Sequence, residues 1–151
     1  MKTRKNLGSL DEAIALAATA HCGQVDKQGA PYILHPLRVM MALRNEGLSE
    51  IYQIVGILHD TVEDSEVSLD EIRDRFGDRA ADALELLTHE KGVPYLEYVQ
   101  LITVDPIATE VKKRDLRDNS DFSRFFPGVN YPKYAQAMAI LLRAPKVENA
   151  V

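Results

Sequence analysis

Apolar residues recur at helical spacing along almost the whole chain, and this periodicity limits the folds open to it. In one segment Ile51, Ile54, Val55 and Leu58 follow the i, i+3, i+4, i+7 stripe of a buried helix face. An alternation of apolar and polar residues, which would indicate a half-buried strand, never continues for more than a few residues. The sequence therefore predicts an all-α fold.

Capping residues and prolines predict where the helices begin and end. Ser9 suits the N-cap of a first helix, and Ser68 with Glu71 forms the capping-box pattern of a later one. Pro36 and Pro106 suit the first turn of two others. These signals predict a bundle of about eight helices, near residues 10–20, 35–46, 51–58, 69–76, 80–87, 95–102, 106–118 and 133–142, with longer loops at 23–34 and 119–132.

Length, composition and charge restrict the class of protein. A chain of 151 residues with 46% hydrophobic and 27% charged residues is expected to form one folded domain over 1–151, without room for a second catalytic domain. The single cysteine, Cys22, has no partner for an intramolecular disulfide and is expected to be a small buried residue of a cytoplasmic protein. A net charge of −5 disfavours nucleic-acid binding. No stretch approaches the roughly 18 apolar residues that cross a bilayer, so no membrane association is expected.

Four side chains of metal-ligand type stand where they are not expected to be simple solvated charges. His35 starts a predicted helix, His59 and Asp60 follow a buried helical stripe, and Asp115 lies on an otherwise apolar face. Two imidazoles and two carboxylates suit a borderline divalent ion such as Mn²⁺ or Fe²⁺. Taken singly, each has an ordinary alternative: a helix cap for His35, a hydrogen-bonded core position for His59, or an ion pair with an arginine for Asp115.

The sequence around these residues resembles the hydrolase domain of the RelA/SpoT family. The matching stretches are A-H-C-G-Q at 20–24, K-Q-G-A-P-Y-I-L-H-P-L at 27–37, L-H-D-T-V-E-D at 58–64 and V-K-K-R-D-L-R-D-N at 111–119. They occur in the family's order and at its spacing, and the resemblance extends over roughly residues 9 to 145. It implies an HD-type helical bundle that acts as a metal-dependent phosphohydrolase, most similar to the stand-alone small alarmone hydrolases.

The resemblance also implies roles for individual residues. One divalent ion per chain, typically Mn²⁺ with Fe²⁺ or another divalent ion as an alternative, would be held by His35, His59, Asp60 and Asp115. The catalytic acidic pair would be Glu63 and Asp64, and the nucleotide would be contacted by Lys27 and Asn119. Lys112 is expected on the phosphate side because it precedes Asp115 by three residues and so shares its helix face. Asp118 does not match a ligand, and its replacement is expected to be far milder than that of Asp115.

Two departures from the family pattern leave the substrate open. The longer RelA/SpoT enzymes usually have Arg-Lys where this chain has Asp26-Lys27, and a motif like A-D-R-L-H-N where this chain has residues 114–119. The first expectation is hydrolysis of the 3′-pyrophosphate of ppGpp or pppGpp to GDP or GTP. One alternative is an HD phosphohydrolase acting on NADPH or another phosphorylated nucleotide, and another is a non-catalytic alarmone-binding module. The expected partner is a small-molecule nucleotide, and a homodimer is possible.

Overall fold

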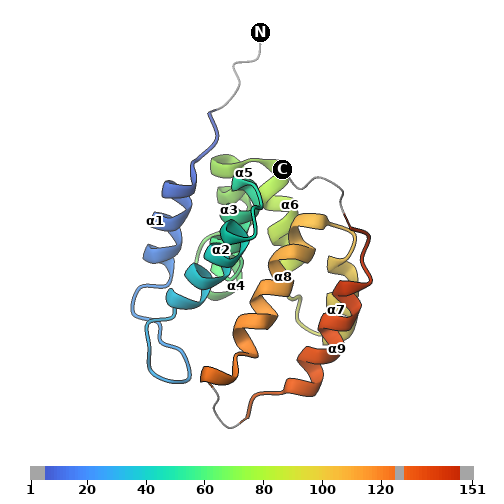
Figure 1. The fold of residues 1–151 in the computed structure, drawn as a ribbon. Helices are drawn as coiled ribbons and strands as arrows, with labels where there is room; N and C mark the ends of the chain where they lie inside the picture. The colour runs from blue at the N-terminus through green and yellow to red at the C-terminus, as the bar shows by residue number, and fades with distance from the viewer. Residues whose placement is uncertain (1–5, 125–127, 147–151) are drawn as a thin grey trace.

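The computed structural model describes residues 6–124 and 128–146, and it confirms the all-α prediction (Figure 1). Its elements are α1 (Leu10–Ala20), α2 (Leu34–Asn45), α3 (Glu50–Leu58), α4 (Thr61–Asp64), α5 (Leu69–Phe76), α6 (Asp78–Leu87), α7 (Tyr95–Ile102), α8 (Pro106–Asn119), the 3-10 helix η1 (Phe122–Arg124) and α9 (Tyr131–Leu142). Over the described ranges, extended pairing is limited to an isolated bridge between Val25 and Pro31. All eight predicted helices are present, and the one-turn helix α4 is an addition.

Local signals explain several helix ends. The Ser9 side chain accepts a hydrogen bond from the Glu12 amide at 3.3 Å, while the Glu12 carboxylate accepts from the Ser9 amide at 2.6 Å, which completes a capping box at α1. Ser68 caps α5 through the Glu71 amide at 3.1 Å. Between α5 and α6 the backbone of Gly77 has a φ of +92°, a conformation that glycine adopts without steric cost.

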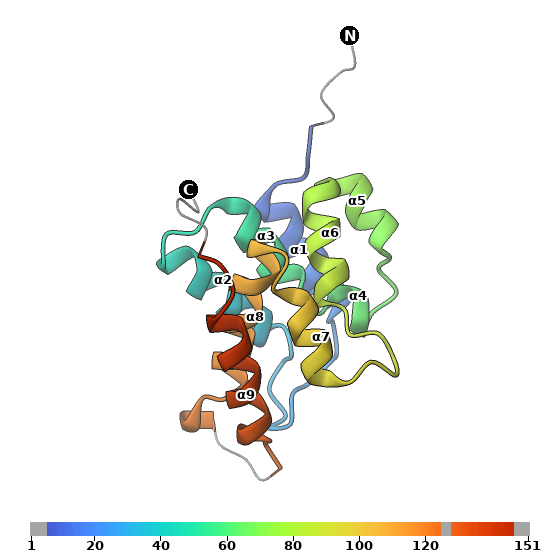
Figure 2. The same cartoon turned by 90° about the vertical axis from the view of Figure 1, so that its right-hand side faces the viewer.

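Three helices, α2, α3 and α8, pack against one another in the middle of the molecule (Figure 1). Helices α1 and α6 cover α3, while α7 and α9 pack together beside α8 (Figure 2). The fully buried side chains include Leu43 of α2, Ile57 and Leu58 of α3, and Val111 and Leu116 of α8. A packed core therefore fixes the relative positions of the three helices on which the candidate ligands lie.

Two details differ from the sequence-based expectations. Cys22 is exposed rather than buried, because α1 ends at Ala20 and the cysteine lies in the turn beyond it. Helix α9 begins at Tyr131, with Asn130 as its N-cap accepting from the Lys133 amide, so the preceding loop is shorter than predicted. Among the helices of the described ranges, none combines the length and the apolar character that a membrane crossing requires.

Candidate metal centre

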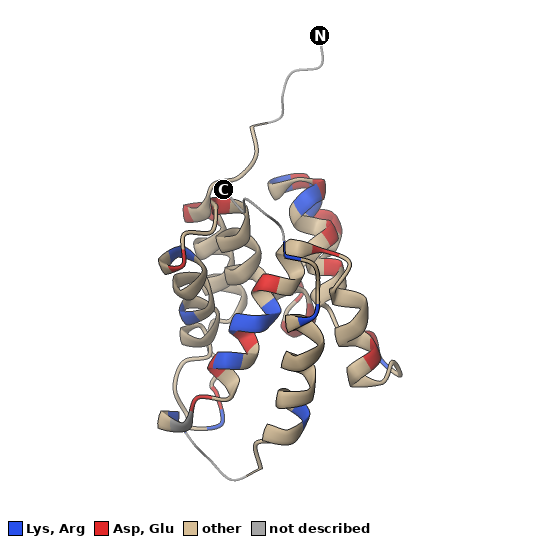
Figure 3. Ribbon diagram, turned by 45° about the vertical axis from the view of Figure 1, so that its right-hand side comes forward, with Lys and Arg blue, Asp and Glu red and all other residues tan. Residues whose placement is uncertain are grey.

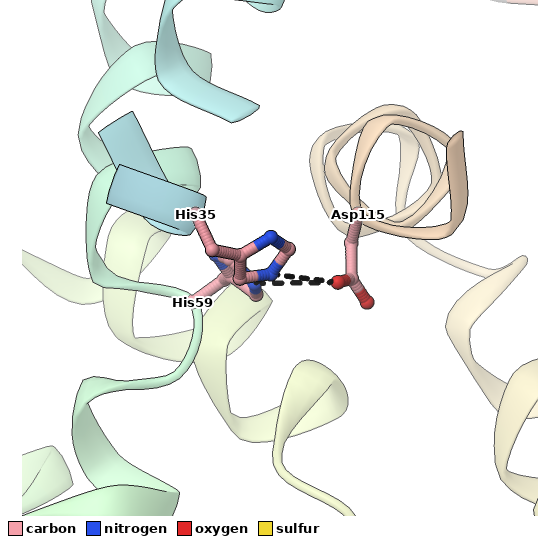
Figure 4. Close-up of side chains that lie close together, drawn as sticks. All are labelled: His35, His59 and Asp115. Atoms are coloured by element: carbon pink, nitrogen blue, oxygen red, sulfur yellow. Dashed lines mark hydrogen bonds and ion pairs between the residues drawn. The ribbon is translucent and has the colours of Figure 1, made fainter. Parts of the chain in front are cut away.

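The four predicted ligand residues come together at the junction of α2, α3, α4 and α8. Figure 4 shows three of them, His35, His59 and Asp115. His35 lies in the first turn of α2, His59 ends α3, Asp60 precedes α4 and Asp115 projects from α8. His35 Nε2 lies 3.2 Å from His59 Nε2 and 3.1 Å from Asp115 Oδ1, and His59 Nε2 lies 3.0 Å from Asp60 Oδ2. The side chains of His35, His59 and Asp115 are 7%, 3% and 6% exposed and that of Asp60 is 17% exposed, so most of the cluster is withdrawn from water.

The outer nitrogen of each imidazole ring has a partner of its own. His59 Nδ1 donates to the carbonyl oxygen of Gly56 at 2.7 Å, and His35 Nδ1 lies 2.6 Å from Asp118 Oδ2. Both Nε2 atoms consequently face the carboxylates of Asp60 and Asp115. His35, His59 and Asp115 each offer a ligand atom within 4.8 Å of the others, a grouping that could hold a metal ion. Asp60 Oδ2, 3.5 Å from His35 Nε2 and 3.0 Å from His59 Nε2, adds a second carboxylate oxygen, and the mixed donor set suits a divalent ion.

The electrostatics of the cluster favour a positive charge at its centre. Burial alone would lower the pKa of His59, but the negative charge of Asp60 and hydrogen bonding to Asp115 raise that pKa well above its usual value. Without a metal ion, the surroundings therefore stabilise a proton on the ring. The same carboxylates would stabilise a metal cation in its place.

Polar side chains hold the two carboxylates in position. Lys112 donates from Nζ to Asp115 Oδ2 at 2.7 Å, and Asn119 donates from Nδ2 to Asp115 Oδ1 at 2.9 Å. Burial alone would raise the pKa of Asp115, but the charge of Lys112 keeps that pKa well below its usual value. The Tyr32 hydroxyl donates to Asp60 Oδ2 at 2.6 Å. Sequence reasoning missed Tyr32, although the residue lies three positions before His35 in a quoted stretch.

Asp118 is a second residue whose place sequence reasoning missed. Besides its contact with His35, it accepts two hydrogen bonds from Arg38, at 2.7 and 3.0 Å, and one from Arg124 at 2.8 Å. Burial alone would raise the pKa of Asp118, but its bonds to His35 and Arg38 hold that pKa below its usual range. The only signal in the sequence is that Asp118 lies three residues after Asp115, on the same side of the helix.

A cavity of about 260 Å³ opens beside His35. Its walls include Lys27 and Gln28 from the loop before α2, Asn119 at the end of α8 and Tyr134 of α9. Two of the predicted nucleotide contacts, Lys27 and Asn119, are thus found in one cavity next to the cluster. Lys112 does not line it. Figure 3 shows that basic and acidic residues alternate along α8, the helix that contains both Asp115 and Asn119.

The predicted acidic pair lies on α4, directly after Asp60. Glu63 and Asp64 are both exposed, and they line a separate hollow together with Gln24. The Glu63 carboxylate accepts a hydrogen bond from the backbone amide of His89 at 2.8 Å. Partial burial and the negative charges of Asp60 and Glu63 raise the pKa of Asp64. Asp64 is therefore within electrostatic reach of Asp60, one of the four predicted ligands.

Comparison with known proteins identifies relatives of which this chain matches only a part. Guanosine-3′,5′-bis(diphosphate) 3′-pyrophosphohydrolase of Aquifex aeolicus is 33% identical over 118 residues, which cover 73% of this chain and 17% of that protein. A protein of the same name from Homo sapiens is 39% identical over 94 residues, which cover 60% of this chain and 52% of the human protein. The chain therefore spans about half or less of the length of these relatives.

A solved structure and a family profile agree with these matches. The structure, described as a metazoan ortholog of SpoT that hydrolyzes ppGpp, superposes with a TM-score of 0.72 over 95% of this chain and 89% of that one. At 21% identity this likeness shows a common fold. The resemblance to the RelA/SpoT hydrolase domain is confirmed by the names of the relatives. The HD domain profile matches residues 13–115, well over half of the 151 residues, so the chain belongs to the HD domain family.

Proposed function

We propose that the chain is a metal-dependent phosphohydrolase that removes the 3′-pyrophosphate from ppGpp or pppGpp and leaves GDP or GTP. The observation that carries the proposal is the buried convergence of two imidazole nitrogens and two carboxylates beside a cavity that contains Lys27 and Asn119. The names of the relatives in Aquifex aeolicus and Homo sapiens support the choice of substrate.

In this proposal His35, His59, Asp60 and Asp115 hold one divalent ion, with Mn²⁺ as the first candidate and Fe²⁺ as the alternative. When bound, such an ion neutralises phosphate charge and lowers the pKa of water at the site. The chain's own contribution is to hold the donors in place. Tyr32 fixes the carboxylate of Asp60, while Lys112 and Asn119 together fix both oxygens of Asp115.

Glu63 and Asp64 are proposed to accept the proton of the attacking water. Asp64 lies on α4, four residues after the candidate ligand Asp60, and this position beside the proposed ion supports the role. Glu63 is held by the His89 amide, which fixes the orientation of its carboxylate. The start of the loop between α6 and α7 therefore supports one member of the pair.

Lys27 and Asn119 are proposed to contact the nucleotide in the cavity. Lys112 was expected on the phosphate side, and its bond to Asp115 supports an indirect role, in which it holds a ligand of the ion. Asp26 also lines the cavity, where its carboxylate accepts from the amides of Gln28 and Ala30 at 2.8 and 3.0 Å. An acidic residue on this wall is the observation that keeps NADPH or another phosphorylated nucleotide as a second candidate substrate.

A side-by-side release assay tests the proposal. Purified protein is incubated with ppGpp, pppGpp, NADPH or pyrophosphate, with Mn²⁺ and after chelation, and the products are separated and quantified. Pyrophosphate released from ppGpp only in the presence of metal is the expected result, and Asp60→Asn should abolish it. Release of phosphate from NADPH, without release of pyrophosphate from ppGpp, would favour NADPH as the substrate. Tight binding of ppGpp without any turnover would instead indicate a non-catalytic alarmone-binding module.

A further inference from the structure

Asp118 joins the candidate metal ligand His35 to the wall of the cavity. Its Oδ2 lies 2.6 Å from His35 Nδ1, the shortest of the carboxylate contacts that either imidazole makes. The Asp118 side chain is 11% exposed and that of His35 is 7% exposed, so water competes little for this bond. The contact crosses from α8 to α2 and bridges 83 residues of sequence.

Two arginines fix the carboxylate that makes this contact. Arg38 donates from Nε to Asp118 Oδ1 and from Nη2 to Oδ2, the two-pronged geometry that orients a carboxylate most firmly. Arg124 donates from Nη2 both to Asp118 Oδ1 and to the Asp118 carbonyl oxygen at 2.6 Å. The carboxylate therefore cannot rotate away from His35 without breaking bonds to both cations.

We propose that Asp118 is a positioning residue that fixes the tautomer and orientation of His35 and thereby sets the metal affinity of the site. The inference rests on the metal-binding part of the proposed function. A carboxylate that accepts Nδ1–H leaves the Nε2 lone pair directed at the cluster and makes that nitrogen a stronger donor. Loss of such an outer partner typically lowers metal affinity by about 10- to 100-fold. Residues 114–119 resemble the motif A-D-R-L-H-N, in which histidine occupies the position of Asp118. The aspartate is therefore a departure of this chain from that motif.

Metal titration of the chelator-stripped full chain tests the proposal directly. Mn²⁺ affinity is measured by isothermal titration calorimetry for wild type, Asp118→Ala, Asp118→Asn and the control Asp121→Asn. Asp121 also accepts a hydrogen bond from Arg124, at 3.1 Å, but its carboxylate makes no contact with His35. Asp118→Ala should bind Mn²⁺ about 10- to 100-fold more weakly. Asp118→Asn should lose less, because its amide oxygen can still accept Nδ1–H, and Asp121→Asn should retain the wild-type affinity.

A spectroscopic readout separates positioning from a general structural effect. In the Zn²⁺-loaded protein, which is diamagnetic, long-range ¹H–¹⁵N correlation should show His35 protonated at Nδ1 in wild type. That signal should shift or broaden away in Asp118→Ala while the signals of His59 stay in place. Far-UV circular dichroism checks that each variant is folded, and if Asp118→Ala is not, Asp118→Asn decides the question.

The possible failures are distinguishable. Equal Mn²⁺ affinity in wild type and a folded Asp118 variant overturns the positioning role, even if ppGpp is hydrolysed. An equal loss in Asp121→Asn overturns it too, since the effect would then belong to Arg124. If wild type binds Mn²⁺ and Asp118→Ala binds it more weakly but neither hydrolyses ppGpp, the positioning role stands and the proposed substrate fails. A wild-type chain that binds neither Mn²⁺ nor Zn²⁺ overturns both.

Discussion

Lys112 places a positive charge directly behind Asp115, and its replacement by methionine tests how the cluster is held together. Lys112 Nζ lies 2.7 Å from Asp115 Oδ2, and the two side chains are only 12% and 6% exposed. The ammonium also lies over the rings of Tyr95 and Tyr98, 5.8 and 5.3 Å from their centroids. Lys112→Met keeps most of the apolar packing of this side chain and removes its charge.

The magnitude follows from the burial of the pair. Two unit charges about 4 Å apart attract each other by about 4 kcal/mol at an effective dielectric constant of about 20. Removing one partner of a buried pair typically costs about 3–5 kcal/mol, because the remaining charge loses an opposite charge that offsets its burial. For a domain of this size each kcal/mol corresponds to about 2–4 °C, so the Tm of the metal-free variant should fall by about 6–20 °C.

Thermal unfolding, followed by circular dichroism in EDTA and in saturating Mn²⁺, measures this effect. An ion bound beside Asp115 supplies a positive charge, so Mn²⁺ should raise the Tm of Lys112→Met more than that of wild type. Lys113→Met is the matched control: its lysine is 15% exposed and pairs with Glu110, away from the cluster. Equal losses of Tm in the two variants, or a deficit in Lys112→Met that Mn²⁺ does not reduce, would refute the reasoning.

Four further predictions address the site and the fold. His59→Ala should lose both bound metal and turnover, and stoichiometric Mn²⁺ by elemental analysis with a near-normal rate would remove His59 from the ligand set. Glu63→Gln and Asp64→Asn should retain the metal while single-turnover rates fall by about 10²- to 10⁴-fold; rates within a few-fold of wild type would contradict a proton-accepting role. Lys27→Ala should raise KM for ppGpp and largely preserve kcat, whereas a lower kcat at unchanged KM would show that Lys27 acts in the transition state. Burial alone would raise the pKa of Glu110, but hydrogen bonds from Lys113 and Arg114 hold that pKa below its ordinary 4.5. The ion pairs of Glu110 therefore stabilise the fold above pH 4.5, and this stabilisation is lost as the pH falls through the lowered pKa. Glu110→Gln should therefore flatten the acid limb of the unfolding free energy measured by urea denaturation.

Helix positions were predictable wherever a local signal marks them. Ser9 and Ser68 cap their helices through neighbours only three residues away, so the sequence alone contains the whole interaction. The one-turn helix at Thr61–Asp64 could not be predicted, since four residues are too few to show a helical period. Cys22 was misplaced for a related reason, because its exposure depends on where α1 ends rather than on its residue type.

The candidate ligands were predictable from motif spacing, whereas the residues that support them depend on packing between distant helices. His35 and His59 stand in stretches of recognisable pattern, and the structure brings their Nε2 atoms to 3.2 Å. The contact of Asp118 with His35 arises only when α2 docks on α8, so the sequence predicts a mild effect for its replacement and the structure predicts a substantial one. Sequence spacing indicates which residues share a helix face, but it does not indicate what that face meets.

The distribution of the four candidate ligands over α2, the α3–α4 junction and α8 has a consequence for folding kinetics. Donors that lie tens of residues apart converge only after the central helices have packed, so partly folded chains contain no more than fragments of the site. An ion that recognises the complete donor set would bind the native state and not the folding transition state. Added Mn²⁺ would therefore slow unfolding while leaving the refolding rate unchanged, and the lifetime of the native chain would follow the concentration of the ion.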